Sequence, residues 1–254
     1  MQETRILMGM PVTVEVVDDR PSDDLRAIIN TVFAYFEYVD EKFSTYKERS
    51  EISLINNREL TVEQASKDMQ IVFALAEETK QATNGYFDIT HNGRYDPSGL
   101  VKGWAIYNAA AILRQKGFAN FYVEAGGDIQ VAGKNPVGQT WRVGIRNPFN
   151  LHEIVKVLAV SNCGVATSGT YIRGQHIYNP NHQGQLMTEV ISLTVIGPDI
   201  YEADRFATAA FAMGRAGITF IEQLDGFEGY QIDQQGQAIF TSDFSRYVSY
   251  AETH

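Results

Sequence analysis

The sequence predicts an α+β fold made of mostly antiparallel sheet with packed helices, arranged as one compact domain over residues 1–254 or as two interlocked lobes. Helix-like periodicity dominates the first half of the chain, and short apolar or alternating runs separated by glycine-rich turns dominate the second half. There is no long internal repeat and no low-complexity linker that would divide the chain.

In the first half, an alternating strand is expected over 12–17. An amphipathic helix follows over Ser22–Asp40, because its apolar residues recur at helical spacing. A short helical turn is expected over Ser50–Asn56. Thr61 and Gln64 form a capping box that opens a helical region ending before Asn84. An alanine-rich helix should run from about Val101 to Lys116 and stop at Gly117.

The second half is predicted to be rich in strands, followed by helices near 199–213 and 216–224 and by a terminal hairpin. The expected strands are 121–125, 129–131, 141–145, 155–160, 165–167 and 190–196, and the hairpin pairs 229–232 with 238–241. Gly126-Gly127 interrupts the first two strands, which suggests a bulge or a close approach of the backbone. Asp128 is a candidate to complete a turn there.

Composition and charge narrow the class of partner. The chain has 254 residues, of which 44% are hydrophobic, which is enough for a full core. The net charge is −10 and no Lys/Arg cluster exists, which argues against nucleic acid or an anionic membrane as partner. No apolar run approaches the ~20 residues that span a bilayer. The N-terminus lacks a basic-then-apolar signal, so we expect a cytoplasmic chain as given, or a periplasmic one if a leader was removed.

The single cysteine, Cys163, excludes an internal disulfide. It lies in an apolar run, so we interpret it as a small core residue rather than a nucleophile.

Asp204 is the first candidate functional residue. The stretch 199–213 begins with Asp199 as cap and Glu202 three residues later, and most of it is small or apolar, so the helix should be buried. Asp204 and Thr208 are four apart and share one face. A buried carboxylate needs a compensating partner. Either a hard cation held by oxygen ligands or an ordinary bond to Thr208 or to an arginine elsewhere would provide it.

Lys102 is the second candidate. Together with the glycines around it, it lies near the start of a predicted helix, where free N–H groups and the helix dipole favour a phosphate. The spacing is not that of a P-loop, and a lysine in an ordinary loop is the alternative.

Taken together, nine motifs in this order resemble the FAD:protein FMN transferases, the ApbE-type family long labelled thiamine-biosynthesis lipoproteins. They are Met8-Gly9, 43–46 with 50–53, 85–90, 96–103, 126–129, 141–145, 166–169, 176–180 and 203–208. The resemblance implies an ApbE/T-fold-like α+β domain. It also implies an enzyme that uses Mg²⁺ to cleave FAD, attaches FMN through phosphate to a Thr or Ser of an acceptor flavoprotein, and releases AMP.

The resemblance also implies roles for particular residues. Asp204 and Thr208 are similar to the family's Mg²⁺ ligands, beside the carbonyls of Gly99 and Ala207, and Asp204 thereby counts as catalytic. His176 matches a histidine that could accept the acceptor hydroxyl proton or bond the flavin. The positions that match the FAD site are Met8, Tyr46, Asp88, Asp96, Lys102 and His176.

Among these, Lys102 would neutralise pyrophosphate charge. Tyr46 would offer its ring to flavin or adenine, with a core-edge tyrosine as the alternative.

Three departures from the family pattern stand out. Only a few residues separate Thr90 from Asp96, where typical members have a much longer segment, so part of the FAD-site wall must be missing or replaced. Asn179 replaces an aspartate before Pro180, and Pro97-Ser98 replaces a more apolar pair. Two other functions therefore remain open, an FAD pyrophosphatase and a protein that binds FAD without chemistry.

Overall fold

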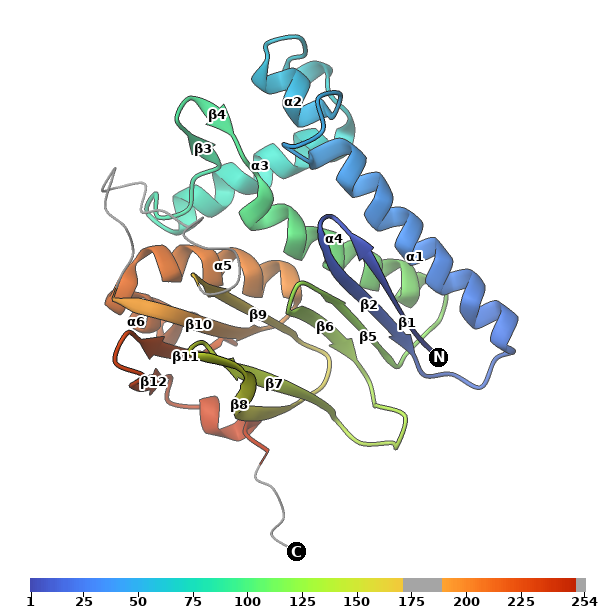
Figure 1. Cartoon of the computed structure of the whole chain (residues 1–254), viewed down its shortest axis with the longest axis vertical. Helices are drawn as coiled ribbons and strands as arrows, with labels where there is room; N and C mark the ends of the chain where they lie inside the picture. The colour runs from blue at the N-terminus through green and yellow to red at the C-terminus, as the bar shows by residue number, and fades with distance from the viewer. Residues whose placement is uncertain (171–188, 250–254) are drawn as a thin grey trace, which may run out of the picture.

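The computed structural model describes residues 1–170 and 189–249, and its centre is an eight-stranded sheet (Figure 1). The strand order is β1-β2-β5-β6-β9-β10-β11-β12, and every neighbouring pair is antiparallel. The strands are β1 (Gln2–Leu7), β2 (Met10–Val16), β5 (Phe121–Ala125), β6 (Asp128–Ala132), β9 (Gly164–Gly169), β10 (Val190–Gly197), β11 (Glu228–Asp233) and β12 (Ala238–Phe240). This confirms the predicted α+β class.

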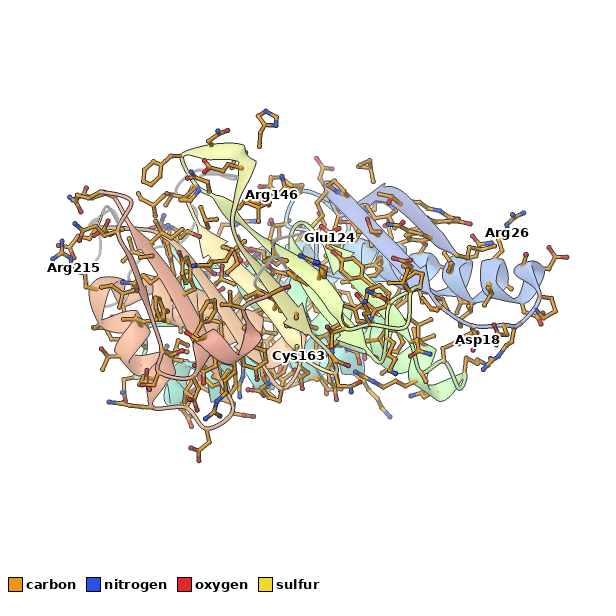
Figure 2. The ribbon with its side chains drawn as sticks, turned by 90° about the horizontal axis from the view of Figure 1, so that it is seen from below. Asp18, Arg26, Glu124, Arg146, Cys163 and Arg215 are labelled. Atoms are coloured by element: carbon orange, nitrogen blue, oxygen red, sulfur yellow. The ribbon has the colours of Figure 1, made fainter. Side chains whose placement is uncertain are left out.

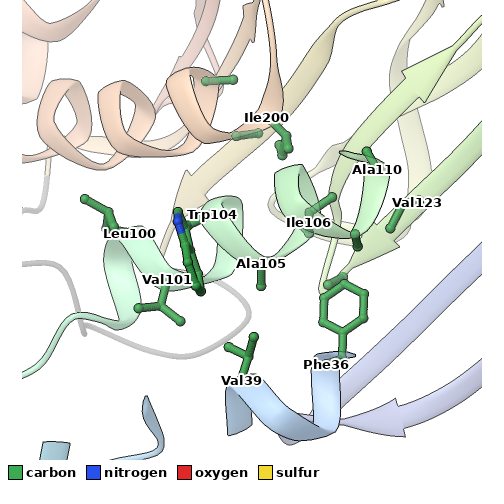
Figure 3. Close-up of a cluster of buried hydrophobic side chains, with 14 of the residues drawn as sticks. Phe36, Val39, Leu100, Val101, Trp104, Ala105, Ile106, Ala110, Val123 and Ile200 are labelled. Atoms are coloured by element: carbon green, nitrogen blue, oxygen red, sulfur yellow. The ribbon is translucent and has the colours of Figure 1, made fainter. Parts of the chain in front are cut away.

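Helices cover one face of this sheet (Figure 1). The α-helices are α1 (Ser22–Phe43), α2 (Glu51–Asn56), α3 (Lys67–Ala82), α4 (Ser98–Gln115), α5 (Ile200–Ala212) and α6 (Gly217–Glu222), with short 3₁₀ turns η1 (Val62–Gln64), η2 (Gly214–Ala216) and η3 (Phe244–Tyr247). Figure 3 shows α4 at the centre of this core, between Phe36 and Val39 of α1 and Ile200 of α5. Burying these side chains is the main stabilising contribution of the helical layer.

The opposite face of the sheet is covered by a separate hairpin. Its strands are β7 (Trp141–Asn147) and β8 (Asn150–Val160). The inward side of β7 alternates strictly with exposed residues, as a half-buried strand must. Side chains of this hairpin and of η3 pack on the sheet in a second apolar cluster, which includes Trp141, Leu158 and Phe244.

The strongest sequence patterns give the expected elements. The apolar stripe predicted over 22–40 is the buried face of α1, which continues one further turn to Phe43. The helix predicted near 101–116 is α4, and Gly117 follows it in a left-handed conformation (φ 79°). The helical region that begins after Thr61 is divided into η1 and α3.

Two short hairpins escaped prediction. Strand β1 turns back into β2 through Met8 and Gly9, both at positive φ (51° and 71°). Strands β3 (Thr90–His91) and β4 (Arg94–Tyr95) are joined the same way by Asn92-Gly93. Two consecutive left-handed residues match the natural twist of a two-residue hairpin. The shortened segment between Thr90 and Asp96 is thus a complete small hairpin.

Burial makes the Cys163 thiol a poor nucleophile. The residue is buried, and this burial raises the pKa of its thiol to about 11, so little thiolate forms at neutral pH. That agrees with a core role for Cys163.

In Figure 2, Arg26 and Arg215 project from opposite ends of the molecule. Within the described residues, no helix has the length and apolarity needed to cross a bilayer. The single-domain organisation of residues 1–254 stays a prediction.

Candidate functional site

The candidate site lies where the first turns of α4 meet α5. Gly99 and Gly103 are four apart on α4, and Asp204 and Thr208 are four apart on α5, so each pair shares a helix face. A Cβ at position 103 would lie 2.6 Å from Asp204 Cβ and 2.9 Å from the Ile200 carbonyl oxygen. A Cβ at position 99 would lie 3.3 Å from Thr208 Cγ2. The two glycines therefore allow the helices to approach closely.

The N-terminus of α5 is fixed by side-chain caps. The Asp199 carboxylate accepts a hydrogen bond from the Glu202 N–H at 2.9 Å, as the sequence predicted. The Glu202 side chain, however, pairs with Arg205 at 2.7 Å instead of completing a capping box. The buried Gln130 side chain of β6 accepts the Ile200 N–H at 2.9 Å. Strand β6 therefore holds the start of α5 in place.

Asp204 is buried, with 3% of its surface exposed. Its Oδ2 accepts the Gly103 N–H at 2.8 Å, and its Oδ1 lies 3.6 Å from Lys102 Nζ. These partners replace the threonine and the arginine considered from the sequence. Burial raises the pKa of Asp204 well above its ordinary value, and although Lys102 opposes this, the neighbouring Asp128 carboxylate adds to it. A cation at this position would stabilise the charged carboxylate.

Asp128 corrects one sequence interpretation. The Gly126-Gly127 pair, at φ 60° and 97°, is the turn between β5 and β6 rather than a bulge within a strand. Asp128 is the first residue of β6 and is only 1% exposed. Its Oδ2 forms an ion pair with Lys102, and its Oδ1 accepts the Thr167 N–H at 3.0 Å. Asp128 does complete the turn, opposite Ala125, but its burial could not be predicted from the sequence because it depends on distant elements.

Thr208 supplies a hydroxyl next to a main-chain carbonyl. Its Oγ1 donates to the Gly99 carbonyl oxygen at 3.3 Å. Ala207 is fully buried in the interior of α5, and the role of its carbonyl as a ligand stays a prediction. Together, Asp204, Thr208 and Gly99 offer one carboxylate, one hydroxyl and one carbonyl oxygen from two adjoining helices. In residues 1–170 and 189–249, no three His, Cys, Asp or Glu side chains gather as a metal site, so any ion here would depend on mixed oxygen donors.

Tyr46 is nearly fully exposed, with 97% of its surface accessible, in the loop between α1 and α2. This contradicts the alternative of a core-edge tyrosine. An exposed ring with so few contacts contributes little to folding and is free to meet a ligand.

The other predicted binding residues have local structural partners. Met8 lies in the β1–β2 turn and packs partly against the main core. Asp96 is exposed and its carboxylate accepts the Ser98 N–H at 3.0 Å, at the start of α4.

Asp88 forms an ion pair with Lys80 at 2.8 Å. Partial burial alone would raise the pKa of Asp88, but Lys80 and the Thr90 N–H hold it below its ordinary value. The binding roles of Met8, Asp88 and Asp96 stay predictions, and His176, with Asn179 and Pro180, lies outside the described residues.

Comparison with known proteins identifies relatives in sequence. The FAD:protein FMN transferase of Escherichia coli (strain K12) is 28% identical over 155 residues, covering 58% of this chain and 44% of that protein. The enzyme of the same name from Vibrio cholerae serotype O1 is 31% identical over 128 residues, covering 47% and 38%. These matches span less than half the length of either relative.

Solved structures share the fold over nearly the full length. The flavin transferase ApbE from Vibrio cholerae superposes with a TM-score of 0.84 at 22% identity, covering 97% of this chain and 98% of that one. The ApbE protein of Thermotoga maritima gives 0.85 at 21% identity, covering 98% and 99%. At such identities the likeness establishes the fold.

The family's sequence model matches residues 8–94 and 91–230. The two matched segments meet at the β3–β4 hairpin, where the motifs indicated a shortened segment. The resemblance of the collinear motifs is thereby confirmed, and this chain belongs to the ApbE family.

Proposed function

We propose that this protein transfers FMN from FAD to a Thr or Ser hydroxyl of an acceptor flavoprotein, with Mg²⁺, and releases AMP. Membership of the ApbE family supports the reaction class. The observation that carries the proposal is the group of oxygen donors from Asp204, Thr208 and Gly99, with Lys102 Nζ 3.6 Å from Asp204 Oδ1. A hard cation and an ammonium side by side suit a substrate that carries a pyrophosphate.

The donor group fits Mg²⁺. That ion prefers six oxygen ligands at about 2.0–2.1 Å, which places adjacent ligand oxygens about 3 Å apart. Thr208 Oγ1 and the Gly99 oxygen are 3.3 Å apart, and Asp204 adds a carboxylate from the same helix face. When bound, the ion would polarise phosphoryl oxygens and neutralise charge that develops on them.

The chain's own residues would bind and orient the substrate. Lys102 would attract the pyrophosphate oxygens, and Tyr46 would cover one ring of FAD. In the transfer, the acceptor hydroxyl oxygen forms a bond to the FMN phosphorus while the bond to the AMP oxygen breaks. The hydroxyl proton goes to a base, and His176 is the predicted base.

AMP release from FAD, measured with Mg²⁺ and with or without a candidate acceptor domain, tests this proposal. The acceptor's intact mass is read in parallel. We expect AMP together with one added FMN per acceptor. AMP release with no modification of any acceptor that presents a Thr or Ser would support a pyrophosphatase. Bound FAD without AMP at any Mg²⁺ concentration would support an FAD-binding protein without chemistry.

Tyr46→Ala should weaken FAD binding about tenfold, because stacking on an aromatic ring contributes about 1–3 kcal/mol. The free energy of unfolding should stay within about 0.5 kcal/mol, since the ring is almost fully exposed. Fluorescence titration of FAD and urea denaturation measure the two quantities.

Phe149→Ala, which removes another exposed ring from the turn between β7 and β8, is the matched control and should not change FAD affinity. Equal FAD affinity of Tyr46→Ala and the wild type would contradict the predicted role of Tyr46.

A further inference from the structure

Asp128 is a buried carboxylate that forms an ion pair with Lys102 beside Asp204. The Thr167 N–H of β9 fixes its Oδ1 at 3.0 Å, and its other oxygen contacts Lys102 Nζ. Because β6 and β9 are neighbouring strands of the central sheet, this carboxylate is held between two paired strands. Its position is therefore set before any ligand arrives.

Lys102 lies between two acids but not midway between them. Its ammonium contacts Asp128 directly, whereas Asp204 Oδ1 is 3.6 Å away. The second oxygen of Asp204 is already bonded to the Gly103 N–H, so Oδ1 is the atom for which Lys102 and a metal ion would compete. Both are cations, and a carboxylate oxygen that pairs fully with an ammonium is a poorer ligand for a divalent ion.

We propose that Asp128 is a positioning residue that draws Lys102 away from Asp204 and so keeps Asp204 available to a divalent cation. The inference rests on the metal site of the proposed function. It adds a residue that touches neither the cation nor the donors Thr208 and Gly99. With Asp128 present, the three charged groups sum to −1 around the site. Without it, they sum to zero, and of the two acids that pair with Lys102 in the described residues only Asp204 remains.

The experiment uses Mn²⁺ itself as the probe, bound to the full chain at pH 8 without FAD and measured from the loss of the free Mn²⁺ spin-resonance signal. Asp128→Asn should weaken Mn²⁺ binding about tenfold or more, because a negative charge a few Å from a divalent ion is lost and Lys102 turns to Asp204. The double variant Asp128→Asn/Lys102→Met should restore binding to within about threefold of the wild type. A purely structural role for Asp128 would not be rescued by removing Lys102.

Two controls separate this inference from the proposed function. Asp204→Asn should abolish Mn²⁺ binding, and if it binds like the wild type, the metal site itself is refuted. Asp243→Asn removes a carboxylate from a more exposed ion pair with Arg246 and should leave binding unchanged. If Asp204→Asn loses Mn²⁺ while Asp128→Asn keeps wild-type affinity, only the role of Asp128 is overturned.

Circular dichroism checks that each variant is folded. If Asp128→Asn does not fold, Lys102→Met decides the question alone. It removes the competing ammonium and leaves both acids, so it should bind Mn²⁺ more tightly than the wild type. Equal or weaker binding would overturn the proposal.

Discussion

Asp204→Asn is expected to lower Mg²⁺-dependent AMP release from FAD about 100-fold or more. Asparagine keeps the size of the side chain and can still accept the Gly103 N–H, so the packing of α4 on α5 should survive. It removes the one carboxylate of the proposed donor group, and a neutral amide oxygen binds Mg²⁺ weakly. AMP release at saturating FAD across a range of Mg²⁺ concentrations measures the effect.

Glu202→Gln on the same helix is the matched control for this prediction. Glu202 pairs with the buried Arg205 and is not among the proposed donors, so its loss should lower the free energy of unfolding while AMP release by the folded enzyme changes little. Full activity of Asp204→Asn would contradict the role of Asp204 as a Mg²⁺ ligand, and with it the proposed Mg²⁺-dependent reaction at this site.

Gly103→Ala is expected to lower the free energy of unfolding by about 2 kcal/mol or more. Alanine favours a helix over glycine by about 1 kcal/mol, so propensity alone predicts the opposite sign. The new methyl group would lie 2.6 Å from Asp204 Cβ and 2.9 Å from the Ile200 carbonyl, and the latter is backbone that cannot rotate away. Helices α4 and α5 would have to separate. Urea denaturation followed by circular dichroism measures the change.

Gly99→Ala on the same helix face gives the comparison. Its methyl group would meet Thr208 Cγ2 at 3.3 Å, which a small side-chain shift relieves, so the loss of stability should be clearly smaller. If Gly103→Ala were as stable as the wild type or more stable, the close packing of α4 on α5 would not be the reason for a glycine at position 103.

The sequence predicted those elements whose signals are local. The stripe on α1 and the cap at Asp199 depend on residues a few positions apart, and both are present. Strand β1 has no such signal, because it is an edge strand of mostly polar residues in which exposed and partly buried positions alternate and none is fully buried. The β3–β4 hairpin has strands of two residues each, too short for any periodicity to show.

In the candidate site, too, the features with a local sequence signal were predicted and those that depend on distant residues were not. The spacing of Asp204 and Thr208 indicated a shared helix face, and the structure places Thr208 against Gly99 and Asp204 against Gly103 of α4. The partner of Lys102 was not predictable from spacing, because Asp128 belongs to a strand beyond the end of α4. The burial of Asp128 was not predicted either, because the burial of a residue at a strand end depends on the elements that pack over it.

The separation along the chain between the two halves of the site has a consequence for how the protein reaches its native state. The bond from the Gly103 N–H to Asp204 joins residues 101 positions apart. Closing so long a loop costs entropy that no local contact returns, so contacts of this kind form late in folding. The contact between Lys102 and Asp128 joins residues only 26 positions apart, so it closes a much shorter loop at a smaller entropic cost.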